Sequence, residues 1–144
     1  MITDIENAKD ALEGHSIALC KDGKIITSDL RGVAPMLSFL DNETDLSGFS
    51  AADLIVGKAA AMLFVKAGIK EVYARVMSQS GRDFLIRHGI ECSYGTLCEK
   101  IINRDKTDIC PMEKAVGDTD DVDEGIERIK NKLSFLRSMK KLER

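Results

Sequence analysis

The chain has 144 residues, of which 44% are hydrophobic and 31% charged, enough to bury a sizeable core in one domain without disulfides. Its net charge of −3 offers no basic footprint for duplex nucleic acid. Asp53, Lys58 and Lys66 interrupt the best apolar stretch, so no membrane span is expected. The polar, acidic start does not resemble a secretory signal, and a cytoplasmic location is therefore expected.

Three short elements are predicted in the first third of the chain. A capping box at residues 3–6 begins a helix that Gly14 ends. Two extended runs then meet at Asp22-Gly23, a dipeptide that favours a type I′ turn and therefore an antiparallel hairpin. Pro35 suits the first turn of a brief helix.

Residues 49–69, FSAADLIVGKAAAMLFVKAGI, predict a central helix that is apolar on nearly every face. Such a helix is normally buried. Ser50 and Asp53 form a capping box at its predicted start, and Gly68 is a suitable residue to end it.

Strand and helix then alternate. Residues 71–77 predict a strand, residues 82–88 a short helix that Gly89 ends, and residues 90–95 another strand. Strand–helix–strand units with short loops form right-handed parallel crossovers. Together with the hairpin they predict a three-layer α/β/α fold around a mixed sheet.

The end of the chain predicts an amphipathic helix. Residues 96–117 read as short helical pieces around a polar turn. After them, apolar residues recur at steps of four and three, with acidic residues before the helix and basic ones at its end. We therefore divide the chain into an α/β domain over residues 1–117 and a helical segment over residues 118–144, packed on that domain or on a partner. The recurring residues are Val122, Ile126, Ile129, Leu133 and Leu136.

Asp53 and Lys58 are the first candidates for chemistry. Asp53 is either a capping carboxylate or a proton carrier. Lys58 stands among small residues, which let a ligand approach closely, so it either meets an anion or extends its ammonium into water. Buried lysines are rare unless they are paired, and both readings stay open.

Hydroxyl groups and one thiol provide further candidates. Ser78 and Ser80 follow a strand and precede a helix, where they either cap the helix or bind an anion, together with Ser50. Cys110 precedes a predicted helix start, a position that favours a nucleophilic thiolate, although a partly buried structural cysteine is the more common case. Asn103, Arg104 and Glu113 flank it as candidate ligand-binding residues.

No metal and no cofactor are predicted. The four cysteines form no C-x-x-C pair, and the chain has only two histidines. A zinc cluster of His88, Cys92 and Cys98 is therefore less favoured than buried free thiols beside a surface histidine.

The stretch GKAAAMLFVKAGIKEVYARVMSQSGRDFLIRHGI, with the element order around it, resembles the cytidine-deaminase-like fold. More narrowly, DLIVGKAAA, the serine after VM, INR and CPME resemble a small prokaryotic family of unknown function that has this fold. The resemblance covers most of residues 10–117 and mainly implies the architecture.

The resemblance also exposes a departure. Deaminases of this fold begin one helix with His-or-Cys-Ala-Glu and the next with Pro-Cys-x-x-Cys, which bind zinc and supply the proton-shuttling glutamate. The stretches aligned with them are SAAD at residues 50–53 and SQSG at residues 78–81. Neutral hydroxyls do not hold zinc, so hydrolytic deamination by the usual mechanism is not expected.

Two functions remain open. The favoured one is a protein that binds an anionic or nucleotide-like small molecule without zinc, with metal-independent group transfer as a possible activity. The other is a non-catalytic regulatory or interaction module whose C-terminal helix joins a partner or a second copy, which makes a homo-oligomer an open prediction. The sequence leaves open whether the protein is an enzyme.

Overall fold

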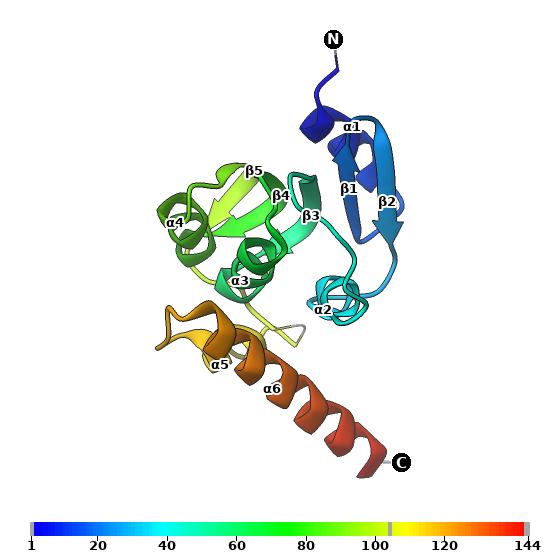
Figure 1. The fold of residues 1–144 in the computed structure, drawn as a ribbon. Helices are drawn as coiled ribbons and strands as arrows, with labels where there is room; N and C mark the ends of the chain where they lie inside the picture. The colour runs from blue at the N-terminus through cyan, green and yellow to red at the C-terminus, as the bar shows by residue number, and fades with distance from the viewer. Residues whose placement is uncertain (1, 104, 143–144) are drawn as a thin grey trace.

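A five-stranded mixed sheet in the order β2-β1-β3-β4-β5 forms the centre of the fold (Figure 1). The structure, a computed structural model, describes residues 2–103 and 105–142. The strand β1 pairs antiparallel with β2 and β3, whereas β3, β4 and β5 run parallel. The predicted hairpin followed by parallel strands is therefore confirmed. The strands are β1 (Ile17–Lys21), β2 (Lys24–Ser28), β3 (Ser50–Val56), β4 (Glu71–Ser78) and β5 (Glu91–Cys98).

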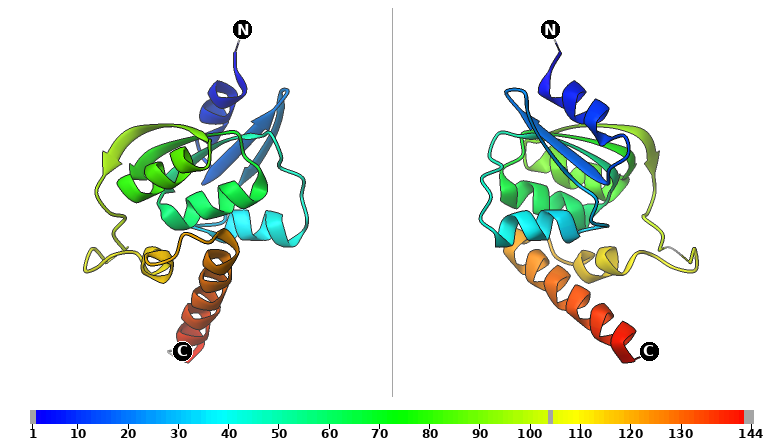
Figure 2. Two further views of the ribbon diagram at one scale, coloured as in Figure 1. Left: turned by 60° about the vertical axis from the view of Figure 1, so that its left-hand side comes forward. Right: turned by 90° about the vertical axis from the view of Figure 1, so that its right-hand side faces the viewer.

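Helices cover both faces of the sheet, as Figure 2 shows. On one face α1 packs its buried Ala8 and Leu12 against Ala18 and Ala52 of the strands. The larger core lies on the other face, where α2, α3, α4, α5 and α6 all contribute buried apolar side chains. The helices are α1 (Asp4–Leu12), α2 (Ala34–Asp41), α3 (Lys58–Ala67), α4 (Gln79–Arg87), α5 (Pro111–Val116) and α6 (Val122–Leu142).

The predicted helix over residues 49–69 is wrong in its first third. Residues 50–56 form β3, the strand at the middle of the sheet, and the helix α3 begins only at Lys58. A short apolar run cannot be assigned to strand or helix from periodicity alone, and this one is paired on both edges. The capping box of Ser50 and Asp53 therefore does not exist, because both residues lie in a strand.

Other local predictions are confirmed. The helix α1 has the capping box of Thr3 and Glu6. Asp22 and Gly23 both adopt positive φ angles, 49° and 81°, as a type I′ hairpin turn requires. Gly68 ends α3 in the left-handed conformation.

The helix α6 packs on the body through its first half only. Gly125, Ile126 and Ile129 are buried, and Gly125 lies against the side chain of Met62 on α3. The distal half of α6 extends away from the body (Figures 1 and 2). Within the described ranges, no helix is long and apolar enough to cross a bilayer.

The start of α4 lies very close to the turn between β3 and α3. A Cβ atom added at Gly81 would lie 2.9 Å from the carbonyl carbon of Gly57 and 3.0 Å from the carbonyl oxygen of Val56. Backbone atoms cannot move aside easily, so only glycine fits at this position.

We predict that Gly81→Ala lowers the free energy of unfolding by about 1–3 kcal/mol, because the methyl group overpacks this contact. Urea denaturation followed by circular dichroism measures it. The matched control is Gln79→Ala on the exposed surface of the same helix. A Gly81→Ala protein as stable as the wild type would contradict the close approach.

Candidate functional site

The start of α3 is capped by a carboxylate from α5. Glu113 accepts hydrogen bonds from the backbone amides of Lys58 and Ala59, both at 2.8 Å. Gly57 has no side chain that could cap the helix, and a Cβ atom there would overlap the Glu113 carboxylate. The positive end of the α3 dipole, where a ligand anion would bind, is thus occupied by the chain's own anion.

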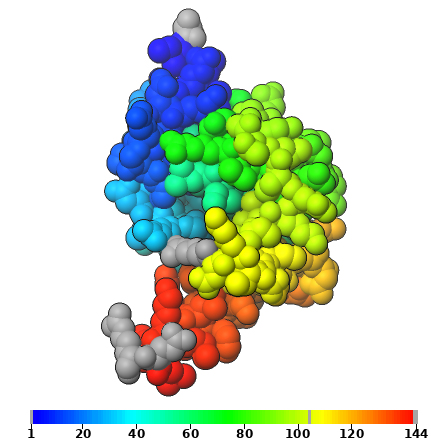
Figure 3. Space-filling view, turned by 180° about the vertical axis from the view of Figure 1, so that it is seen from behind, coloured from blue at the N-terminus to red at the C-terminus, as the bar shows by residue number. Residues whose placement is uncertain are grey.

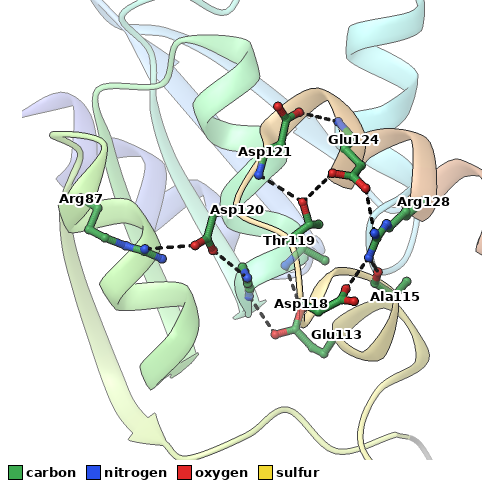
Figure 4. Close-up of polar contacts among 11 residues, drawn as sticks. Arg87, Glu113, Ala115, Asp118, Thr119, Asp120, Asp121, Glu124 and Arg128 are labelled. Atoms are coloured by element: carbon green, nitrogen blue, oxygen red, sulfur yellow. Dashed lines mark hydrogen bonds and ion pairs between the residues drawn. The ribbon is translucent and has the colours of Figure 1, made fainter.

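Lys58 is buried and paired. Only 9% of the residue is exposed, and its Nζ lies 3.0 Å from Oδ1 of Asp120. Arg87 approaches the other oxygen of the same carboxylate at 3.5 Å (Figure 4). The hydrogen bond from Lys58, reinforced by Arg87, holds the pKa of the Asp120 carboxyl below its ordinary value.

The loop that supplies Asp120 is tied to the start of α6, as Figure 4 shows. Thr119 donates from Oγ1 to Glu124 at 2.9 Å, and the amide of Glu124 donates to Asp121 at 2.8 Å. Arg128 pairs with Asp118 and with Glu124. The partner of Lys58 is therefore held by a network of short contacts.

The two serines at the start of α4 cap that helix. The Oγ of Ser78 is buried and accepts from the amide of Gly81 at 3.1 Å, and the exposed Ser80 has its Oγ 3.2 Å from that of Ser78. Among the described contacts, neither hydroxyl bonds to the ammonium of Lys58. The capping alternative is thus observed for Ser78.

The other predicted site residues are scattered. Ser50 begins β3, at the end of the strand opposite Lys58, and its buried Oγ has no hydrogen-bond partner within the described residues. Cys110 is the partly buried N-cap residue of α5, and its side chain makes no capping hydrogen bond. Asn103 shapes its own loop by accepting from the amides of residues 107 and 108. Arg104 lies outside the described residues.

A cavity with both charged and apolar lining residues opens where β1 and β3 part. Their pairing ends at Ile17 and Asp53, so the last three residues of β3 extend beyond β1. The chain before β1 and the segment after β2 form the other walls of a cavity of about 470 Å³. Its lining residues are Gly14, His15, Ser16, Asp29, Arg31, Gly32, Asp53, Leu54 and Ile55.

Three charged groups and a histidine surround this cavity. Nδ1 of His15 lies 2.7 Å from the Asp29 carboxylate, and Arg31 is exposed. Oδ1 of Asp53 accepts from the amide of Leu54 at 2.7 Å, and burial raises the pKa of Asp53 to about 7. A carboxyl that changes protonation near neutral pH therefore borders a cavity, as acid–base groups in ligand sites do.

His15, Asp29 and Arg31 were not predicted as site residues, although one signal in the sequence points to two of them. In the hairpin register Ile17 faces Ser28, which brings the residues just outside the two strands together. The correctly predicted turn at Asp22-Gly23 thus implies that His15 and Asp29 are neighbours.

Comparison with known proteins decides the family. Residues 8–133 match the family described as "Domain of unknown function (DUF1893)". The chain belongs to this family. The resemblance to a small family of unknown function is therefore confirmed. No curated protein matches the DUF1893 chain.

A solved structure agrees with this assignment. A DUF1893 family protein from Thermotoga maritima has 26% identity and a TM-score of 0.79, over 91% of this chain and 88% of that one. Two deaminases are also similar. The diaminohydroxyphosphoribosylaminopyrimidine deaminase/5-amino-6-(5-phosphoribosylamino)uracil reductase of Thermotoga maritima has 17% identity and a TM-score of 0.47, over 64% and 35%. The dCMP deaminase of cyanophage S-TIM5 has 15% identity and a TM-score of 0.43, over 66% of this chain and 94% of that one.

The structure of this chain corrects the first half of the proposed alignment with deaminase motifs, whereas SQSG at residues 78–81 does stand at a helix start. SAAD at residues 50–53 lies within a strand and cannot stand at a helix start. The helix that follows this strand begins with Lys58-Ala59, after Gly57. Across residues 2–103 and 105–142, no group of three or more His, Cys, Asp or Glu side chains is placed to hold a metal ion.

We predict that Glu113→Gln lowers the free energy of unfolding by about 1–3 kcal/mol, because an amide offers only one oxygen to the two N–H groups and carries no charge. Thermal and urea unfolding measure it. Glu99→Gln removes the same charge from an exposed loop and should leave stability unchanged. If both changes lowered the free energy of unfolding equally, Glu113 would not be the cap of α3.

We predict that Asp53→Asn stabilises the protein at pH 8 and has little effect at pH 4. The pKa is raised from 3.8 to about 7, so the ionised carboxyl destabilises the fold increasingly as the pH rises through this window. Three pKa units correspond to about 4 kcal/mol; because the side chain is partly exposed, we expect about 1–3 kcal/mol. Urea unfolding of both proteins at the two pH values measures it, and a gain independent of pH would contradict it.

Proposed function

We propose that this DUF1893 protein binds a nucleotide-like anionic small molecule, without a metal, in the cavity beside Asp53. The observation that carries the proposal is the position of Asp53, a carboxyl with a pKa of about 7, on a cavity of about 470 Å³ that runs along the carboxyl-terminal half of β3. Pockets of this size accommodate metabolites. Ligands of open α/β sheets commonly bind at the carboxyl ends of strands.

The lining of the cavity suits a molecule with an anionic end and a hydrogen-bonding ring. Arg31 offers the planar donor group that recognises phosphate or carboxylate. Asp53 accepts hydrogen bonds from ring N–H and amino groups when ionised and donates one when protonated. Leu54 and Ile55, which extend beyond the pairing with β1, supply apolar side chains to the same cavity.

In this proposal Asp53 is the residue that exchanges a proton with the bound molecule. Lys58 and Glu113 instead hold α3, α5 and the following loop together, since both charges already have partners in the chain. Cys110 does not line the cavity. Group transfer by a thiol is therefore not part of the proposed activity.

The alternative, a non-catalytic interaction module that uses the C-terminal helix, is supported by a different observation. The end of α6 exposes Phe135, Met139 and Leu142. This surface is compatible with ligand binding elsewhere on the molecule.

We predict that isothermal titration with CMP, UMP, AMP and GMP detects binding of at least one of them, and that Arg31→Ala weakens it about tenfold or more, equivalent to about 1.4 kcal/mol. Asp53→Asn should remove the change in affinity between pH 6 and pH 8. Arg137→Ala removes a comparable exposed charge from α6 and should have no effect.

Two outcomes would contradict the proposal. One is the absence of binding heat for all four nucleotides, and the other is binding that both cavity variants leave unchanged. A response to Lys58→Ala alone, in a protein that remains folded, would place the ligand at the start of α3 instead.

A further inference from the structure

The distal half of α6 carries an apolar stripe, formed by Phe135, Met139 and Leu142, that its own domain does not cover. These residues are 55%, 43% and 80% exposed. They follow one another at steps of four and three, which places them on one side of the helix. The space-filling view shows this end of α6 projecting from the body (Figure 3). A partner can therefore reach the stripe without any rearrangement of the domain.

The stripe points away from the groove between α2 and α6. The residues of α6 that line this groove are Lys130, Leu133, Ser134 and Arg137. At 3.6 residues per turn, Arg137 lies about 160° around the helix axis from both Phe135 and Met139. The groove has a mostly polar lining, in which Lys130 pairs with Asp41 at 3.2 Å. The stripe thus belongs to the free side of the helix and needs a partner of its own.

The segment that exposes the stripe is also strongly basic. Between residues 130 and 142 the chain carries five basic residues and no acidic one, although the whole chain has a net charge of −3. The rest of the chain is therefore acidic, and positive charge is concentrated on the projecting helix. Lys132 stands at the border of the stripe, with its Nζ 5.4 Å from the centre of the Phe135 ring. An apolar stripe on a basic helix is typical of segments that bind anionic membrane surfaces.

We infer that the distal half of α6 binds to the surface of an anionic lipid bilayer. In this arrangement the helix lies on the bilayer, its stripe enters the boundary between headgroups and acyl chains, and its basic side chains attract the anionic headgroups. The helix is about 10 Å wide, close to the Debye length at physiological salt, so basic groups on its far side contribute to the attraction.

Charge and shape both favour lipid over a second copy of the chain. Two copies packed stripe against stripe would bring their basic segments together with no acidic residue of those segments between them. A lipid surface instead supplies the opposite charge. It also needs no complementary groove, because acyl chains and headgroups adapt to the three side chains.

Sedimentation of the full chain with lipid vesicles tests this inference. We expect the protein to sediment with vesicles of about 30% phosphatidylserine in phosphatidylcholine at about 0.1 M salt, and to be released at about 0.5 M salt. It should stay in the supernatant with pure phosphatidylcholine. Phe135→Ser should weaken binding about tenfold or more, because the ring no longer enters the bilayer. The double variant Lys140→Gln/Lys141→Gln should weaken it about tenfold.

The matched control is Ile86→Ser on α4, which removes an apolar side chain of the same exposure, 57%. It should leave vesicle binding unchanged, and circular dichroism confirms that all variants stay folded. The inference would be overturned by a protein that does not sediment with phosphatidylserine vesicles, by equal binding to both kinds of vesicle, or by equal losses in Phe135→Ser and Ile86→Ser. A dimer in light scattering that Phe135→Ser converts to a monomer, without vesicle binding, would identify a second copy as the partner instead.

Discussion

The carboxylate of Glu113 on the first two amides of α3 is the interaction on which the arrangement of this molecule depends. It joins α5, late in the chain, to the helix that follows the middle strand. It requires a residue without a side chain at position 57, and Gly57 meets that requirement. The next residue, Lys58, then pairs with Asp120, which places the loop before α6 over the same helix start. The carboxylate of Glu113 and the ammonium of Lys58 both have partners within the chain, so this end of the sheet is closed to an external anion.

Closure at this end leaves the Asp53 cavity as an open site beside the sheet that charged side chains line. The cavity exists because β3 is longer than its antiparallel neighbour on that side, so its last residues and the walls around them diverge. An ionised carboxyl there is partly desolvated and lacks a cationic partner among the described contacts. The free-energy cost of this desolvation raises the pKa of Asp53 to about 7. A ligand that donates hydrogen bonds to Asp53 would lower the cost, which gives binding and protonation a common physical origin.

Local signals in the sequence predicted most of the fold. The α1 capping box, the Asp22-Gly23 turn and the α6 periodicity depend on contacts within a few residues, and these elements formed as expected. The strand over residues 50–56 was taken for helix because it is a short, mostly apolar run without the regular alternation that distinguishes strands. The site was harder to predict, since the partners of Lys58 lie 62 residues away at Asp120, and its amide meets Glu113, 55 residues away. Only tertiary structure brings such groups together.

The most direct test of this account is to map which backbone amides respond when CMP is added to the isotopically labelled protein, using two-dimensional NMR. The account predicts that shifts concentrate at residues 14–16, 29–32 and 53–55, the walls of the Asp53 cavity. Shifts concentrated at residues 57–59 and 78–81 would show instead that an external anion displaces Glu113 from the start of α3. That result would contradict the claim that Glu113 and Lys58 close the start of α3 with the chain's own charges.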